Sequence, residues 1–168
     1  MRRFTMVLWI VVVSVVASSQ TASTGTPSTP EERERAATIA HKLETAPLDE
    51  SLRPDREWLL KWIIQVPDIH VKLCTNVLGN FTKSKYKYSP EIVGQLTFSE
   101  AAFAIEHPDQ ASDDVAQYAA GVEGVLKAYS AILKMKPDAK SKPLDELGEK
   151  QAQGKLVDFV REASKGCK

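Results

Sequence analysis

The chain has 168 residues, of which 43% are hydrophobic and 26% are charged, so it can build one hydrophobic core and is too short for two sizeable domains. Basic side chains (Lys and Arg) and acidic side chains (Asp and Glu) number 22 each. This balance excludes an overall electrostatic field of the kind that recruits nucleic acid or an anionic membrane. Any charged partner must therefore be recognised by a local patch.

The first nineteen residues have the pattern of a secretory signal peptide. Arg2 and Arg3 give a positive start, an apolar run covers residues 4–17, and small residues precede the expected cleavage site after Ser19. An uncleaved membrane anchor is the alternative, although the apolar run is shorter than the ~20 residues that a membrane-spanning helix needs. Cleavage would leave 20 basic and 22 acidic residues, a net charge of −2, in a secreted or periplasmic protein.

The next segments predict a linker and two helices. Residues 20–29 contain only Ser, Thr, Gly, Pro, Gln and Ala, a composition typical of a flexible linker. A helix over residues 30–44 follows, because Thr29 and Glu32 have the spacing of a capping box. A second helix is predicted over residues 54–66, and its first residue is a proline, which favours a helix start.

This second helix carries Trp58 and Trp62 one turn apart on an apolar face. Such a pair belongs to the core in most proteins, and a sugar-stacking platform on the surface is the alternative. A third helix is predicted over residues 68–79, where apolar residues recur at helical spacing and Gly79 gives a suitable end.

The second half of the chain predicts three longer helices, over residues 89–106, 110–134 and 143–164. The middle one is apolar on almost every side, which is typical of a helix enclosed by neighbours. Gly124 lies on a stripe of small residues along it, so we expect another helix to approach closely there. Two glycines weaken the last helix, which can therefore consist of two pieces.

Together these elements predict an all-α fold, a single domain over residues 30–168 that forms an antiparallel bundle of about six helices and no β-sheet. The two cysteines, Cys74 and Cys167, both lie in the part that would be exported. In an oxidising compartment, two thiols in one small domain usually form a disulfide. A buried, unpaired Cys74 is the alternative.

Known patterns for metal, cofactor and nucleophilic chemistry are missing from the sequence. The three histidines lack metal-ligand spacing, and there is neither a Gly-rich phosphate loop nor a nucleophile elbow, so we expect no metal and no cofactor. The best catalytic candidates are Glu100, Glu106 and His107, because two carboxyl groups in one cleft can perform glycosidase chemistry. His107 is equally an ordinary helix terminator before Pro108.

Two lysine-rich connections form the main surface feature. The helices over 89–106 and 110–134 should be antiparallel, which places the connection before the first and the connection after the second at the same end. We expect tyrosines there to stack on rings while lysines bind phosphate or carboxylate groups, and a merely solvated loop is the alternative. The predicted patch consists of Lys83, Lys85, Tyr86, Lys87, Tyr88, Lys134, Lys136, Lys140 and Lys142. The opposite end collects Glu106, Asp109, Asp113 and Asp114.

The leading functional hypothesis is an exported, non-enzymatic binding module. Its expected partner is anionic, such as an anionic polysaccharide, a cell-envelope component or a protein, and not a nucleic acid. A periplasmic chaperone-like stress protein and a carboxylate-dependent hydrolase are the alternatives. Asn80, Phe81 and Thr82 also form an N-glycosylation sequon.

Overall fold

The computed structural model describes residues 25–167, and these residues form helices and no strand, which confirms the predicted all-α class. The predicted signal peptide and the first half of the predicted linker lie outside this range. The elements are α1 (Pro30–Thr45), η1 (Glu50–Leu52), α2 (Arg53–Gln65), η2 (Thr75–Lys83), α3 (Ser89–Glu106), α4 (Asp114–Met135), α5 (Lys142–Ala152) and α6 (Leu156–Ser164), where η marks a 3-10 helix.

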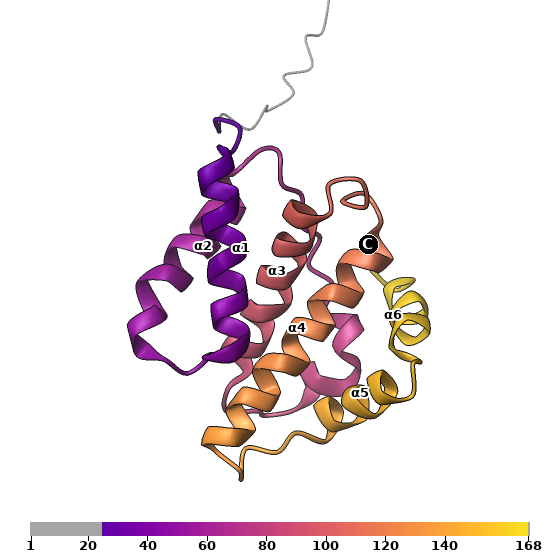
Figure 1. Cartoon of the computed structure of the whole chain (residues 1–168). Coiled ribbons are helices and arrows are strands. Elements are labelled where there is room, and N and C mark those ends of the chain that lie inside the picture. The colour runs from indigo at the N-terminus through magenta and orange to yellow at the C-terminus, as the bar shows by residue number, and fades with distance from the viewer. Residues whose placement is uncertain (1–24, 168) are drawn as a thin grey trace, which may run out of the picture.

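The centre of the molecule is the antiparallel pair α3 and α4 (Figure 1). α1 and α2 lie on one side of this pair, and α5 and α6 lie on the other. Two clusters of buried side chains result, one between α1, α2 and α3 and one between η2, α3, α4, α5 and α6. α3 contributes to both clusters, because it is apolar on nearly every side.

Helix starts follow the local rules that the sequence predicts. At α1, the Thr29 hydroxyl accepts a hydrogen bond from the Glu32 backbone N–H while the Glu32 carboxylate accepts one from the Thr29 backbone N–H. The carboxylate of Asp113 accepts from two backbone N–H groups of the first turn of α4, and α4 therefore begins at Asp114, four residues later than predicted.

The last residues of the predicted linker contact the domain. The Asp68 carboxylate accepts hydrogen bonds from the Ser28 backbone N–H at 2.9 Å, the Ser28 hydroxyl at 2.8 Å and Arg33 at 2.7 Å. The chain therefore enters the fold at the upper end of α1 in Figure 1, whereas α4 ends at the lower end.

Glycines allow α4 to approach α3 and α1 closely, as predicted for Gly124. A Cβ atom at Gly124 would collide with the Ser99 side chain and would lie 2.9 Å from Oε1 of Glu44. Gly121 is a second such position, where a Cβ would lie 2.8 Å from Cγ of Glu100. Ala128, on the same predicted stripe, is fully buried.

The predicted helix over residues 68–79 is wrong. Residues 66–74 form no helix, and the 3-10 segment η2 begins only at Thr75 and is kinked at Gly79, whose φ of 60° favours glycine. Two side-chain contacts explain the open segment. The buried Gln117 amide donates to the His70 backbone carbonyl at 3.3 Å, in place of a helical N–H, and the Asp68 side chain is held by Ser28 and Arg33.

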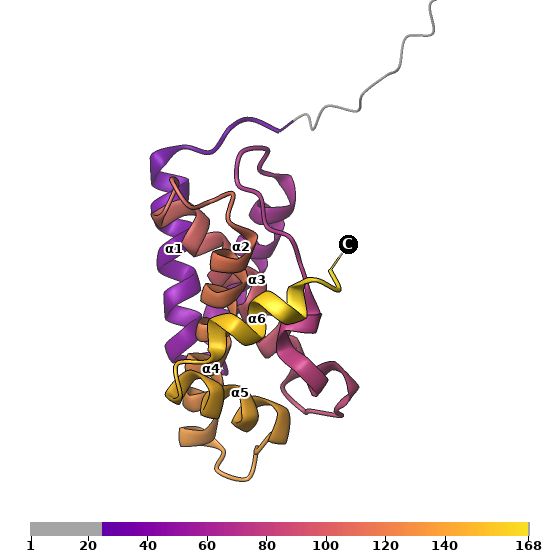
Figure 2. The same ribbon diagram turned by 90° about the vertical axis from the view of Figure 1, so that its right-hand side faces the viewer.

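The predicted helix over residues 143–164 consists of two pieces, α5 and α6, as its two glycines allowed. The chain turns between them at Gly154, which has a φ of 68°, whereas Gly148 lies inside α5. After this turn α6 lies obliquely across the bundle (Figure 2). This course lets α6 pack against both α4 and η2.

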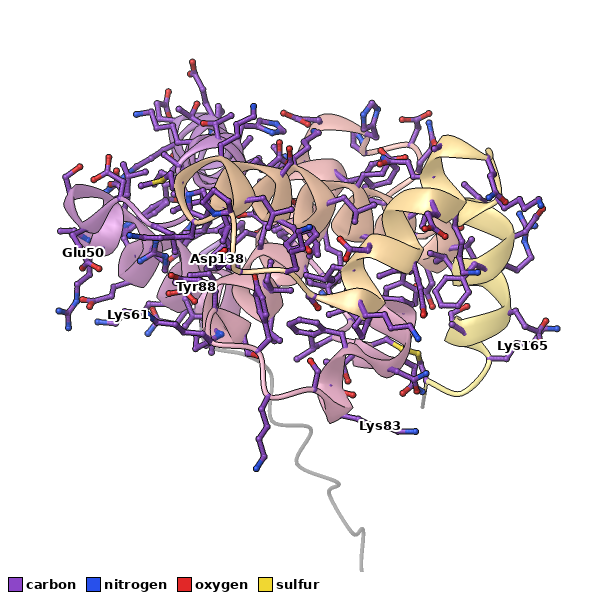
Figure 3. All side chains as sticks on the ribbon, turned by 90° about the horizontal axis from the view of Figure 1, so that it is seen from below. Glu50, Lys61, Lys83, Tyr88, Asp138 and Lys165 are labelled. Carbon is purple, nitrogen blue, oxygen red and sulfur yellow. A yellow bond between two sulfur atoms is a disulfide. The ribbon has the colours of Figure 1, made fainter. Side chains whose placement is uncertain are left out.

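The predicted disulfide between Cys74 and Cys167 is confirmed, with Cα atoms 5.7 Å apart across a sequence separation of 93 residues (Figure 3). It joins the start of η2 to the end of the segment after α6. In residues 25–167 we find no helix with the length and apolar character needed to cross a bilayer.

Candidate functional site

The predicted catalytic residues do not share a cleft. Glu100 points into the interface with α4, is fully buried, and neither of its carboxyl oxygens has a hydrogen-bond partner. Burial raises the pKa of Glu100 to about 9, so this side chain is a neutral acid at pH 7. Glu106 is exposed and accepts a hydrogen bond from His41, and the His107 ring packs at a tilt against Phe103 with ring centroids 4.8 Å apart. Two accessible carboxylates, as glycosidase chemistry needs, are not brought together here.

A chain of polar side chains instead crosses the interior between α1, α3 and α4. The Gln95 amide donates to the Ser99 hydroxyl at 2.8 Å, and Ser99 donates to Oε1 of Glu44 at 3.1 Å. The other carboxylate oxygen of Glu44 accepts from Lys127 at 3.0 Å and from His41 at 3.3 Å. Glu44 is therefore buried with its charge compensated, which is the condition under which an ionised carboxylate is tolerated inside a fold.

This Ser, Glu and His set cannot act as a catalytic triad. In a triad the histidine lies between serine and carboxylate and removes the serine proton, whereas here Glu44 lies between Ser99 and His41. Ser99 is also only 4% exposed. The set joins α1 to α3, and Lys127 adds a contact with α4, so its role is structural.

His41 connects this interior chain to the surface. Its Nε2 donates to Glu106 at 2.8 Å, and its Nδ1 donates to Glu44. Partial burial of the ring works against the charged form, but the two carboxylate partners outweigh it and raise the pKa of His41 above its usual value. The His41 ring thus links α1 to the last turn of α3.

The two predicted lysine-rich connections form one pocket at the lower end of the bundle. One wall is residues 85–88, before α3, and the other is residues 135–140, after α4; the pocket has a volume of about 440 Å³ and is called the loop pocket below. Tyr88 and Asp138, one from each wall, lie close together in the view from below (Figure 3). Segments about fifty residues apart in sequence thus face one another.

Tyr86 holds the two walls together. Its hydroxyl donates to the Ala139 backbone carbonyl at 3.0 Å, and its ring makes edge contacts with Phe81 at 5.6 Å and Tyr129 at 6.2 Å between centroids. Burial raises the pKa of Tyr86, so its hydroxyl keeps the proton that it donates.

Tyr129 fixes the segment that follows the second wall. Its hydroxyl accepts from the Ser141 backbone N–H and donates to Asp145, both at 2.8 Å. Burial raises the pKa of Tyr129 to about 12, so this hydroxyl is also neutral. The pocket is therefore anchored to the core through two tyrosines.

The charge that the loop pocket presents is mainly positive. Its lysines are exposed and, among the described residues, form no ion pair; they are Lys85, Lys87, Lys136 and Lys140. Asp138 is the one acidic residue in the lining. The Lys87 ammonium lies 5.5 Å from the ring centroid of the half-buried Tyr88. Ammonium donors beside an aromatic face can bind an anionic group on a ring.

Three members of the predicted patch do not line the loop pocket. Lys83, at the end of η2, lies well away from Tyr88 and Asp138 in Figure 3. Lys142 lies 3.9 Å from Glu146. Lys134 lines a neighbouring hollow of about 520 Å³, called the α1–α4 groove below. The groove is lined by Glu44, Thr45, Leu126, Lys127, Ser130, Ala131, Lys134, Met135 and Gln151.

The predicted acidic residues lie around the turn between α3 and α4, at the end opposite the loop pocket (Figure 1). Part of their charge is compensated, because Asp114 pairs with Lys72 at 2.7 Å and Glu106 pairs with His41. The loop pocket lysines lack such compensation, so the positive end is the more available of the two for a charged partner.

Sequence reasoning missed the α1–α4 groove and the role of Asp138. The groove depends on how α1 packs against α4, and no local sequence pattern indicates that packing. Asp138 lies within a predicted lysine-rich connection, where its negative charge differs from the positive charge of the neighbouring lysines.

Within residues 25–167, no group of three or more His, Cys, Asp or Glu side chains could hold a metal ion. No protein-family model, curated protein or solved structure matches this chain.

Proposed function

We propose that this protein is an exported, non-enzymatic binding module that binds an anionic ligand in the loop pocket. One observation carries the proposal: lysines from two distant segments line a common pocket without carboxylate partners. Elsewhere in the protein, Arg33, Lys72 and Lys127 all pair with carboxylates at 3.0 Å or less.

The pocket is organised before a ligand arrives. The hydrogen bond from Tyr86 to Ala139 joins the two walls, so a ligand would not have to bring the loops together. Preorganisation of this kind lowers the entropy cost of binding. A site that uses only exposed, flexible lysines on one loop would lack this advantage.

Export is supported by two features. The first nineteen residues match a secretory signal peptide, and disulfides such as Cys74–Cys167 persist mainly in oxidising compartments. A ligand outside the cytoplasm, such as an acidic polymer of a cell envelope or extracellular matrix, fits both features.

The alternative functions have less support. An acid-activated chaperone must loosen as the pH falls, whereas the raised pKa values of Glu100 and His41 favour the folded state at mildly acidic pH. A hydrolase needs accessible carboxylates that converge, and Glu100 is sealed from solvent.

The proposal is tested by salt-dependent retention of purified variants on immobilised heparin, a sulfated acidic polysaccharide. Lys85→Ser with Lys87→Ser removes charge from one wall, and Lys136→Ser with Lys140→Ser removes charge from the other. Either pair should abolish most of the retention, while the thermal midpoint stays unchanged because all four side chains are exposed.

Lys83→Ser is the matched control, since Lys83 belongs to the same basic stretch but lies outside the pocket. It should elute like the unmodified protein. A loss from Lys83→Ser as large as the loss from either pair variant would indicate a diffuse basic patch in place of a pocket. Unchanged retention in both pair variants would rule out the loop pocket as the binding site.

A further inference from the structure

The loop pocket adjoins the α1–α4 groove. Met135 lines both hollows, and the two residues that flank it in sequence belong to one hollow each, Lys134 to the groove and Lys136 to the pocket. From this shared boundary we infer that the ligand is a chain of acidic sugars that occupies both hollows and passes over Met135. The inference rests on the proposed function and specifies its ligand.

The end of α4 produces this arrangement. Met135 is the last residue of the helix, and Lys136 after it has a non-helical backbone (φ −136°, ψ 79°). The side chains of Lys134 and Lys136 therefore line different hollows. Met135 is 56% exposed between them and offers a flexible apolar contact. A ligand that follows the surface around the end of α4 would meet Lys136, Met135 and Lys134 in turn.

The lining of the groove fits sugar hydroxyls better than dense negative charge. Thr45, Ser130 and Gln151 supply neutral hydrogen-bonding groups, and Leu126 and Ala131 supply apolar surface for the face of a ring. Lys127 is already bonded to the buried Glu44 carboxylate, which leaves Lys134 as the cation of the groove without a carboxylate partner among the described residues.

The loop pocket supports the same ligand class. Asp138 in its lining would repel closely spaced phosphates but can accept hydrogen bonds from sugar hydroxyls. The protein as a whole has equal numbers of basic and acidic residues, whereas domains that bind nucleic acid are usually strongly basic. A uronic acid chain, with one carboxylate and several hydroxyls on each ring, matches sparse lysines among neutral polar groups.

A chain that reaches both hollows should bind more tightly than one sugar acid unit, because the second contact becomes intramolecular once the first has formed. The test compares galacturonic acid with its α-1,4-linked hexamer, using the disulfide-bonded protein and a fluorescently labelled hexamer. Unlabelled monomer and hexamer compete for the protein, and single-stranded DNA with the same number of charges serves as the competing polymer.

The hexamer should compete at concentrations roughly 10²-fold or more below those of the monomer. Lys134→Ser should weaken hexamer binding by up to about fivefold, the factor that corresponds to ~1 kcal/mol for one exposed ion pair, and should leave monomer binding unchanged. Lys155→Ser, an exposed lysine that lines neither hollow, is the control and should change neither value.

Three results would overturn the inference while leaving the proposed function intact. One is that the hexamer competes at concentrations no more than about sixfold below those of the monomer. Such a ratio reflects only the number of sugar units per chain and indicates no second contact. Another is a hexamer affinity that Lys134→Ser does not change. The third is stronger competition by the DNA than by the hexamer. If neither heparin nor any of these anions binds, the proposed function itself fails.

Discussion

The hydroxyl group of Ser99 occupies the space that a side chain at Gly124 would need, and from there it donates a hydrogen bond to the buried Glu44 carboxylate. Replacing Gly124 by Leu should therefore displace Ser99 and separate α3 from α4. Overpacking of this kind typically destabilises a protein by about 1–3 kcal/mol, to which the disturbed hydrogen bond would add. Urea unfolding monitored by circular dichroism measures the loss.

Gly148 provides the matched control for this substitution. It lies inside α5, and a Cβ there would meet nothing within 4 Å. Gly148→Ala should raise the free energy of unfolding by up to about 1 kcal/mol, because alanine is the better helix former. A Gly124→Leu variant that is as stable as the unmodified protein would contradict the close approach of α3 and α4.

The Glu100 carboxyl group should make the protein less stable as the pH rises. The folded state keeps its proton up to about pH 9, whereas the ordinary glutamate pKa is 4.5, so between these values the folded state binds more protons than the unfolded state. Stability from this group is complete below about pH 4.5 and should decrease by at most ~1.4 kcal/mol per pH unit above it. Unfolding free energies at pH 5, 7 and 8.5 test this dependence.

Glu100→Gln isolates the contribution of Glu100, because glutamine has a similar shape and does not titrate in this range. The variant should show a flatter decline of stability with pH than the unmodified protein. His41, whose raised pKa also favours the folded state at acidic pH, is present in both proteins and cancels in the comparison. Parallel pH profiles would show that Glu100 is not a buried neutral acid.

Reduction of the Cys74–Cys167 disulfide should lower stability. The bond closes a loop across 93 residues, and the chain-entropy estimate for a loop of about this length is a stabilisation of up to ~4.7 kcal/mol. Urea unfolding with and without a reductant measures the difference, and intact mass should rise by the mass of two hydrogen atoms on reduction. The double variant Cys74→Ala with Cys167→Ala is the control, and the reductant should change neither its stability nor its mass. Equal stability of the oxidised and reduced protein would contradict the prediction.

Tyr86→Phe should weaken ligand binding more than it weakens the fold. The substitution removes the hydroxyl that joins the two walls of the loop pocket and keeps the ring contacts, so the stability loss should stay near 1 kcal/mol. Retention on immobilised heparin should fall. Tyr88→Phe is the control, because the Tyr88 hydroxyl makes no hydrogen bond to protein in residues 25–167. Equal retention of both variants would show that the Tyr86 hydrogen bond does not organise the pocket.

The sequence allowed correct prediction where one local rule dominates. Three features follow from neighbouring residues or from composition. They are the capping box at Thr29 and Glu32, the stripe of small residues at Gly124 and the pairing of the two cysteines. The two lysine-rich connections were expected at the same end because the two helices between them are antiparallel and similar in length. This prediction required only the order of the elements along the chain.

Prediction failed where distant residues decide the local conformation. Ile69, Leu73 and Cys74 have helical spacing, yet Leu73 is 58% exposed. Distant residues hold the segment: Ser28 and Arg33 bind the Asp68 carboxylate, and Gln117 binds the His70 backbone carbonyl. The alternation of apolar Ile69 and Val71 with polar His70 and Lys72 was the signal for an extended course.

The burial of Glu100 could not be predicted from its own helix either. It depends on Gly121, twenty-one residues later, which leaves the room that the glutamate side chain fills. The same limit applies to the α1–α4 groove, whose lining comes from three helices. Helix periodicity identifies the side of a helix that faces inward, and it does not identify which residue of a neighbouring helix lies opposite.

The chain enters the fold beside Asp68 at the end of α1 that lies farthest from the loop pocket (Figure 1). Ser28 and Arg33 fix this entry point, so a support joined to the chain ahead of Gly25 would hold the protein by its acidic end. On a sensor chip or a bead, coupling through the N-terminus would attach the protein at the end opposite the loop pocket and leave its lysines accessible to a ligand.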